Sequence, residues 1–176
     1  MRGDTALTAR LLLFGQGRSG LVVAVGGVLV VTGALLPWYE LVATVSMLGE
    51  DAQRTVAVLR GVPHLLAGFG VLAAGLALVG LGVAAGIDRP PPGARILTAS
   101  AALAAAATAV VALLVRPSVA TLVRRGGADL MALRDELPVG IDLTFAAEPA
   151  VGSWLMLAGG LLALGGLAAT LRVRDR

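Results

Sequence analysis

A lone histidine and a few carboxylates are the side chains of this sequence with the most reactive chemistry. His64 is the only histidine of the chain, and it could bind a metal ion together with Glu40 or Glu148. A metal site, however, needs three or four ligands at defined spacing. A hydrolase triad would need His64 beside a serine and an acid, and the serines at 46, 118 and 153 lie in no nucleophile-elbow motif. We therefore predict no catalytic, cofactor-binding or metal-binding residue, and interpret His64 as an interfacial residue that begins a helix.

Two other groups of charged residues permit a functional and a plainer interpretation. Asp135 and Glu136 are adjacent, so on a helix their side chains diverge and cannot converge on one substrate atom; solvation of a loop helix is the favoured interpretation. Arg124 and Arg125 precede two glycines and could contact an anion such as a lipid phosphate. The alternative, a solvated helix end, is favoured for this arginine pair.

The composition is that of an integral membrane protein. Of 176 residues, 57% are hydrophobic and 14% are charged, which is too apolar for a soluble domain of this size. A helix needs about 20 apolar residues to cross a bilayer, and four charge-free stretches have this length: 19–39, 65–87, 96–115 and 149–171. The first stretch is longer than the apolar core of a signal peptide, so we expect an uncleaved helix. We predict one integral membrane domain, 1–176, with four transmembrane helices.

Charge predicts how these helices are oriented. The segments before the first span, between the second and third, and after the fourth carry a net charge of +5, whereas the segments 40–64 and 116–148 carry −2. Because positive loops stay on the cytoplasmic side, both termini are predicted to be cytoplasmic in a multi-pass plasma-membrane protein. Trp38, Tyr39 and Trp154 fall at the outer ends of spans, where they are predicted to anchor the chain at the membrane interface. The arginines form no long basic run, which argues against nucleic-acid binding.

The spans themselves carry little polar chemistry. They hold no Asp, Glu, Lys, Arg or His, whereas pumps and proton relays use such groups inside the membrane. Small residues recur at spacings that let helix backbones approach closely. We expect these to pack within the bundle rather than against a partner: Gly82 with Gly86, Ser100 with Ala104 and Thr108, and Gly159 with Ala163.

The two outer segments have patterns typical of a small sheet. Residues 41–47 alternate in the manner of a strand, 49–52 supply a turn, and 55–61 read as the returning strand of a hairpin. Residues 119–137 have helical spacing, and 140–149 alternate as a third strand. A lone hairpin is marginal in water, so we predict a three-stranded extracytoplasmic β-sheet plus helix that caps an all-α four-helix transmembrane bundle.

Two boundary motifs carry a family resemblance. The stretches "LLPWYELVATVSM" and "IDLTFAAEPAVGSWLML", which leave the first span and enter the fourth, resemble those of the small actinobacterial tryptophan-associated transmembrane proteins. The resemblance implies the four-span fold and no activity or catalytic residue. The layout is also similar to that of claudins, but the claudin tryptophan and cysteine-pair signature is missing, so the likeness is one of layout alone.

These observations favour a non-enzymatic accessory, assembly or scaffold component of the cell envelope. Its outer cap would contact an envelope protein or another copy of the chain, and no cofactor is expected. The alternative is a carrier of lipids or small molecules, with a cleft between the cap and the aromatic boundary that involves Trp38 or Arg124. A third hypothesis, an envelope enzyme, would join His64 to Glu40, Asp142 or Glu148 in one pocket.

Overall fold

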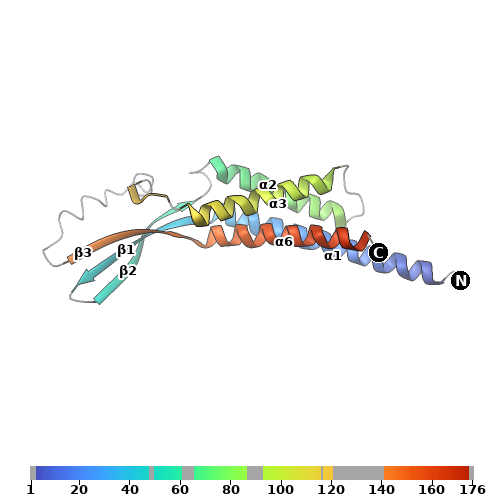
Figure 1. The fold of residues 1–176 in the computed structure, drawn as a ribbon, viewed down its shortest axis with the longest axis horizontal. Helices are drawn as coiled ribbons and strands as arrows, with labels where there is room; N and C mark the ends of the chain where they lie inside the picture. The colour runs from blue at the N-terminus through green and yellow to red at the C-terminus, as the bar shows by residue number, and fades with distance from the viewer. Residues whose placement is uncertain are drawn as a thin grey trace.

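A bundle of long helices and a projecting sheet make up the protein. The computed structural model describes residues 3–47, 50–60, 66–86, 93–115, 117–120 and 141–174. The helices and strands of this part are α1 (Gly3–Leu35), β1 (Pro37–Met47), β2 (Glu50–Arg60), α2 (Leu66–Gly86), α3 (Ala94–Leu114), β3 (Ile141–Pro149) and α6 (Val151–Arg174). Figure 1 shows the helices side by side, with the sheet extending from one end of the bundle and both chain termini at the other end.

Three of the helices are long and apolar enough to cross a membrane: Ala67–Gly86, Ala94–Leu114 and Val151–Ala169. They confirm the helices predicted for the second, third and fourth spans. The first helix differs from the prediction at both ends. It begins at Gly3, and its apolar part, Ser19–Leu35, is shorter than the other three. The predicted end at residue 39 is wrong because a proline disfavours helical geometry in the residue before it, so α1 ends at Leu35 and Pro37 begins β1.

Helix α1 packs against α2 through glycines seven residues apart. Gly20 and Gly27 lie two helical turns from each other and therefore on one face. A Cβ atom built on Gly20 would lie 2.7 Å from the carbonyl oxygen of Gly82, and one on Gly27 would lie 2.7 Å from the amide nitrogen of Val79. The two backbones thus touch directly, as small residues allow in membrane helices. The predicted packing role of Gly82 is confirmed.

A second pair of glycines joins α1 to α6. A Cβ atom on Gly26 would lie 2.6 Å from the carbonyl oxygen of Gly159, and one on Gly33 would lie 2.7 Å from that of Gly152. Ala163, one turn after Gly159, is fully buried. The predicted packing of Gly159 with Ala163 is therefore confirmed, and α1 contacts both α2 and α6.

Helix α3 completes the bundle and contacts α6 and α2. Its buried face consists of Ala94, Thr98, Ala102, Ala105, Ala109 and Ala112. The predicted packing ladder of Ser100, Ala104 and Thr108 is wrong, because Ser100 and Ala104 are exposed and Thr108 is half-buried. Sequence spacing identifies residues on a common face but not the direction of that face. The two hydroxyls donate to carbonyls of their own helix, Ser100 to Leu97 at 3.1 Å and Thr108 to Ala104 at 2.8 Å.

The sheet has three antiparallel strands in the order β2-β1-β3. The hairpin and the third strand are confirmed, although the second strand begins earlier than predicted: β2 already begins at Glu50, opposite Met47, so residues 50–52 belong to the strand. The sheet projects away from the end of the bundle along the long axis of the molecule rather than folding over it as a cap (Figure 1). Most of the predicted outer helix, from residue 121 on, lies outside the described residues.

Candidate functional site

The bundle and the sheet are joined by very short connections. Helix α1 passes into β1 through the single residue Leu36, and β3 passes into α6 through the single residue Ala150. Because β1 pairs with β3 and α1 packs against α6, the two crossings lie side by side. We call the residues that meet there the helix–sheet junction: Gly33, Trp38, Tyr39, Val115, Ala150, Gly152 and Ser153.

The carbonyl oxygen of Trp38 is the centre of this junction. It accepts a hydrogen bond from the amide of Ala150 at 2.8 Å and another from the Ser153 hydroxyl at 2.9 Å. Ser153 is 0% exposed, so its hydroxyl would be costly to leave without an acceptor. The two bonds connect the start of β1 to the start of α6, 115 residues further along the chain.

The Trp38 indole adds a hydrogen bond from β1 to the last turn of α1. Its Nε1 donates to the carbonyl oxygen of Gly33 at 3.1 Å, and the side chain is 2% exposed. Gly152 is required next to it, because a Cβ atom there would lie 2.5 Å from the carbonyl oxygen of Pro37 and 2.7 Å from that of Gly33. The last turn of α1 and the first turn of α6 are therefore in backbone contact where the chain enters the sheet.

Tyr39 links the third helix to the junction. Its hydroxyl donates to the carbonyl oxygen of Val115, just after α3, at 3.2 Å. This carbonyl lies at a helix end, where backbone acceptors lack intrahelical partners. Burial raises the pKa of the Tyr39 hydroxyl above its ordinary value of 10.0, so the group stays protonated and remains a donor at neutral pH.

Replacement of Tyr39 by phenylalanine should lower the free energy of unfolding by about 0.5 to 1.5 kcal/mol, the usual net value of one hydrogen bond. Because the pKa is raised in the folded state, the contribution of the Tyr39 hydroxyl to the free energy of unfolding depends on pH. This contribution is complete below about pH 10 and is lost as the pH rises through the folded-state pKa. Tyr39 is the single tyrosine of the chain, so alkaline absorbance titration reads this group directly. A midpoint at or below 10 in the folded protein would contradict the buried donor.

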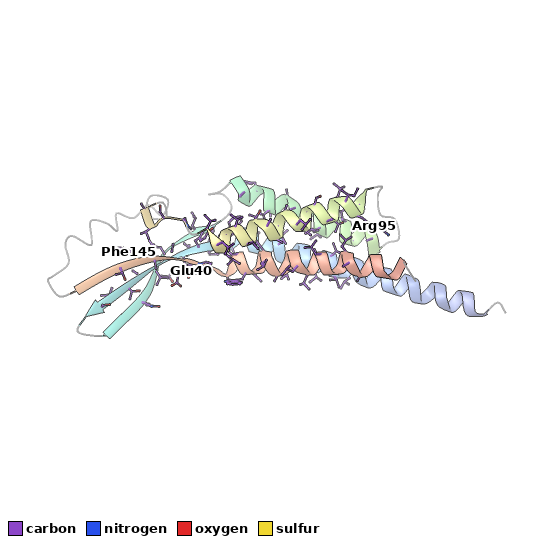
Figure 2. The ribbon with its side chains drawn as sticks, in the orientation of Figure 1. Glu40, Arg95 and Phe145 are labelled. Carbon is purple, nitrogen blue, oxygen red and sulfur yellow. The ribbon has the colours of Figure 1, made fainter. Side chains whose placement is uncertain are left out.

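The two faces of the sheet differ in chemistry. On the apolar face, Leu41 and Ala43 of β1 are buried, as is Ala147 of β3, and Phe145 packs against the core. On the polar face, Glu40 lies directly opposite Glu148. Directly opposite residues of antiparallel strands point to the same side, so these carboxylates are neighbours. Figure 2 shows Glu40 and Phe145 on the sheet and Arg95 at the far end of the bundle.

The three predicted interface aromatics occupy two different environments. Trp38 and Tyr39 are buried in the helix–sheet junction, where their rings contact protein, whereas Trp154 in the first turn of α6 is 56% exposed. The predicted anion contacts Arg124 and Arg125 lie outside the described residues, as does His64. Among the described residues, no three His, Cys, Asp or Glu side chains lie close enough together to hold a metal ion.

Sequence reasoning missed Ser153 and Gly152 as junction residues. Their position in the sequence indicates this role. They are a small residue and a hydroxyl residue in the first turn of an otherwise apolar span, three and four residues after the end of a strand. Their partners Trp38 and Gly33 lie more than 110 residues away in the sequence. No model of a known protein family matches the chain, and no curated protein matches it either.

Proposed function

We propose that this protein is a non-enzymatic scaffold of the cell envelope, held in the plasma membrane by four helices, whose sheet is a rigid outer arm that contacts a partner. The observation that carries the proposal is the helix–sheet junction. Connections of one residue and the two bonds to the Trp38 carbonyl fix the direction of the sheet relative to the helices. A sheet that is held in a fixed direction can bind another protein and position it relative to the membrane.

The side-chain distribution of the bundle supports the membrane location. Glycine and alanine occupy the helix contacts, whereas large apolar side chains point outward on every helix, among them Leu21, Leu76, Leu103 and Leu161. Exposure of such an apolar surface to water is unfavourable, whereas contact with lipid chains is not. Although its apolar part is shorter, α1 runs beside two helices of spanning length, which supports its assignment as a fourth span.

The positions of the charges support an outer sheet. Both termini lie at the end of the bundle opposite the sheet (Figure 1), and Arg95 lies at that end as well (Figure 2). The described parts of the arginine-rich segments therefore share one end, which the positive-inside rule assigns to the cytoplasm. The sheet with Glu40 and Glu148 then lies on the extracytoplasmic side.

The polar groups of the bundle support a structural role. The hydroxyls of Thr98, Ser100, Thr108 and Ser153 all donate to backbone carbonyls at 2.7 to 3.1 Å. Hydroxyls committed in this way stabilise helices and their contacts. The boundary motifs around Trp38 and Trp154 are the basis for proposing, in addition, kinship with the tryptophan-associated transmembrane proteins.

Site-specific photo-crosslinking in cells tests the scaffold role. A photoreactive residue at the exposed sheet position Thr144 should capture a protein, whereas the same residue at the outward apolar position Leu103 of α3 should capture mainly lipid. The matched sites separate contact through the sheet from contact within the bilayer. If several sheet positions yield monomer alone while the protein is correctly inserted, the scaffold role is wrong.

A further inference from the structure

The two outer edges of the sheet are open in the part of the chain that the structure describes. The strand order is β2-β1-β3, and no described strand pairs with the outer side of β2 or β3. Strand β2 is 11 residues long and contains neither proline nor glycine. Open edges of this length can pair with another strand, and such strand addition is a recurrent mode of protein recognition.

The direction of the strands limits how two copies in one membrane can pair. Strands β2 and β3 both run antiparallel to β1, so they run in the same direction as each other. Copies inserted in one membrane share their orientation. The outer edge of β2 can therefore meet the outer edge of β3 of the next copy as a parallel pair, and the polar faces of the two sheets then lie on the same side.

A symmetric pairing of β2 with β2 is less suitable. The twofold axis would run along the membrane normal, which is the direction in which the sheet projects from the bundle, with β1 and β2 inclined to it (Figure 1). Rotation about such an axis turns the second sheet over. The polar face of one copy would then lie on the same side as the apolar face of the other, which carries Leu41 and Ala43. Pairing of β2 with β3 of the next copy avoids this mismatch.

Charge on the two edges agrees with that arrangement. Arg60 lies on β2 two residues after Val58, which is level with Glu40 and Glu148, so Arg60 and Glu148 share the polar face at the bundle end of the sheet. Both side chains are exposed, and neither makes an ion pair with another described residue. Like charges directly opposite each other destabilise a sheet, and Glu148 faces Glu40. A cation beside Glu148 would relieve this repulsion.

We propose that the partner of the outer sheet is a second copy of this chain, joined head to tail through β2 of one copy and β3 of the next, with Arg60 of one copy beside Glu148 of its neighbour. The inference rests on the proposed scaffold role and names its partner. Because a different surface is used on each side of the contact, the copies extend into a ring or an open row in the membrane.

Engineered disulfides test this arrangement, since the natural chain has no cysteine. Thr55 and Ala146 are exposed and level with each other, as both pair with Val42. Within one copy they are separated by β1, which places them about 10 Å apart and beyond disulfide reach. A mixture of full-length Thr55→Cys and Ala146→Cys chains should therefore form disulfide dimers in the membrane, and a chain with both cysteines should form a ladder of higher oligomers.

Each single-cysteine chain alone serves as the first control and should stay monomeric. A mixture of Leu103→Cys with Leu161→Cys, two outward positions on the helices, measures random collision. Dimers of the Thr55→Cys chain by itself would establish the symmetric contact and overturn the proposal. No excess over the collision control would overturn it as well.

Charge reversal provides the second test. Arg60→Glu on the Thr55→Cys chain, or Glu148→Arg on the Ala146→Cys chain, should reduce the dimer yield by about tenfold. The two reversed chains together should recover it, which a mere folding defect would not do. An unchanged yield in either single reversal would contradict the ion pair. Labelling of Ala146→Cys by a membrane-impermeant maleimide separates the hypotheses: external labelling without dimers refutes the head-to-tail contact alone, and failure of external labelling refutes the outer sheet itself.

Discussion

Replacement of Gly152 by leucine should prevent assembly of the bundle. A Cβ atom at this position would meet three backbone carbonyl oxygens, those of Pro37, Gly33 and Leu36, at 2.5, 2.7 and 3.0 Å. Backbone atoms cannot swing aside as a flexible side chain can, so α6 would have to move away from α1 and from the start of β1. Overpacking of a core commonly costs about 1 to 3 kcal/mol and occasionally more, and we expect the upper end of this range or beyond.

The matched control is Gly165→Leu in the same helix, because a Cβ atom there has nothing within 4 Å. Both substitutions replace a glycine of α6 by the same residue, so the added side chain is identical. The measurement is the amount of monodisperse protein in detergent together with its thermal unfolding midpoint. Equal midpoints for the two variants would show that the close contact at Gly152 does not hold the helices together.

Replacement of Trp38 by alanine should be the most damaging truncation at the helix–sheet junction. The side chain is among the largest that are fully buried, and removal of a buried tryptophan costs about 3 to 5 kcal/mol. The variant also leaves the Gly33 carbonyl without the indole donor. Trp38→Phe retains much of the volume and loses that bond, so we expect an intermediate effect.

Trp154→Ala is the control for Trp38→Ala, since Trp154 is the other tryptophan of the chain and is largely exposed. Its removal should change the free energy of unfolding in detergent by about 0.5 kcal/mol or less. Fluorescence of a Trp154→Phe protein then reports Trp38 alone, and unfolding should shift its emission to longer wavelength. A greater loss of stability for Trp154→Ala than for Trp38→Ala would contradict the described burial.

Periodicity in the sequence predicts most of the elements, because it depends on local chemistry. Charge-free runs identify three of the helices closely, and alternation identifies the hairpin and the third strand. The apolar run does not show where α1 ends, because it continues through Trp38 and Tyr39 although Pro37 already begins a strand. An apolar run indicates that residues are buried or in the membrane, but it does not show whether they are helical. The proline at position 37 determines that the helix ends there and a strand begins.

The helix–sheet junction could not be predicted in the same way. Ser153 and Trp38 are 115 residues apart, and Tyr39 and Val115 are 76 apart, so their bonds depend on how the helices are arranged in space. The outward direction of Ser100 and Ala104 has the same origin. Their spacing fits a packing ladder, but the helix is rotated so that its alanine face meets α6 and α2.

The unbroken passage from α1 into β1 and from β3 into α6 has a mechanical consequence. Tension applied at the far tip of the sheet would run along the strands and load the hydrogen bonds between β1 and β3 in shear, where many bonds resist together. It would then enter the axes of two helices whose glycines interlock at Gly26 with Gly159 and at Gly33 with Gly152. A force on the sheet is therefore transmitted along the strands into the packed axes of α1 and α6.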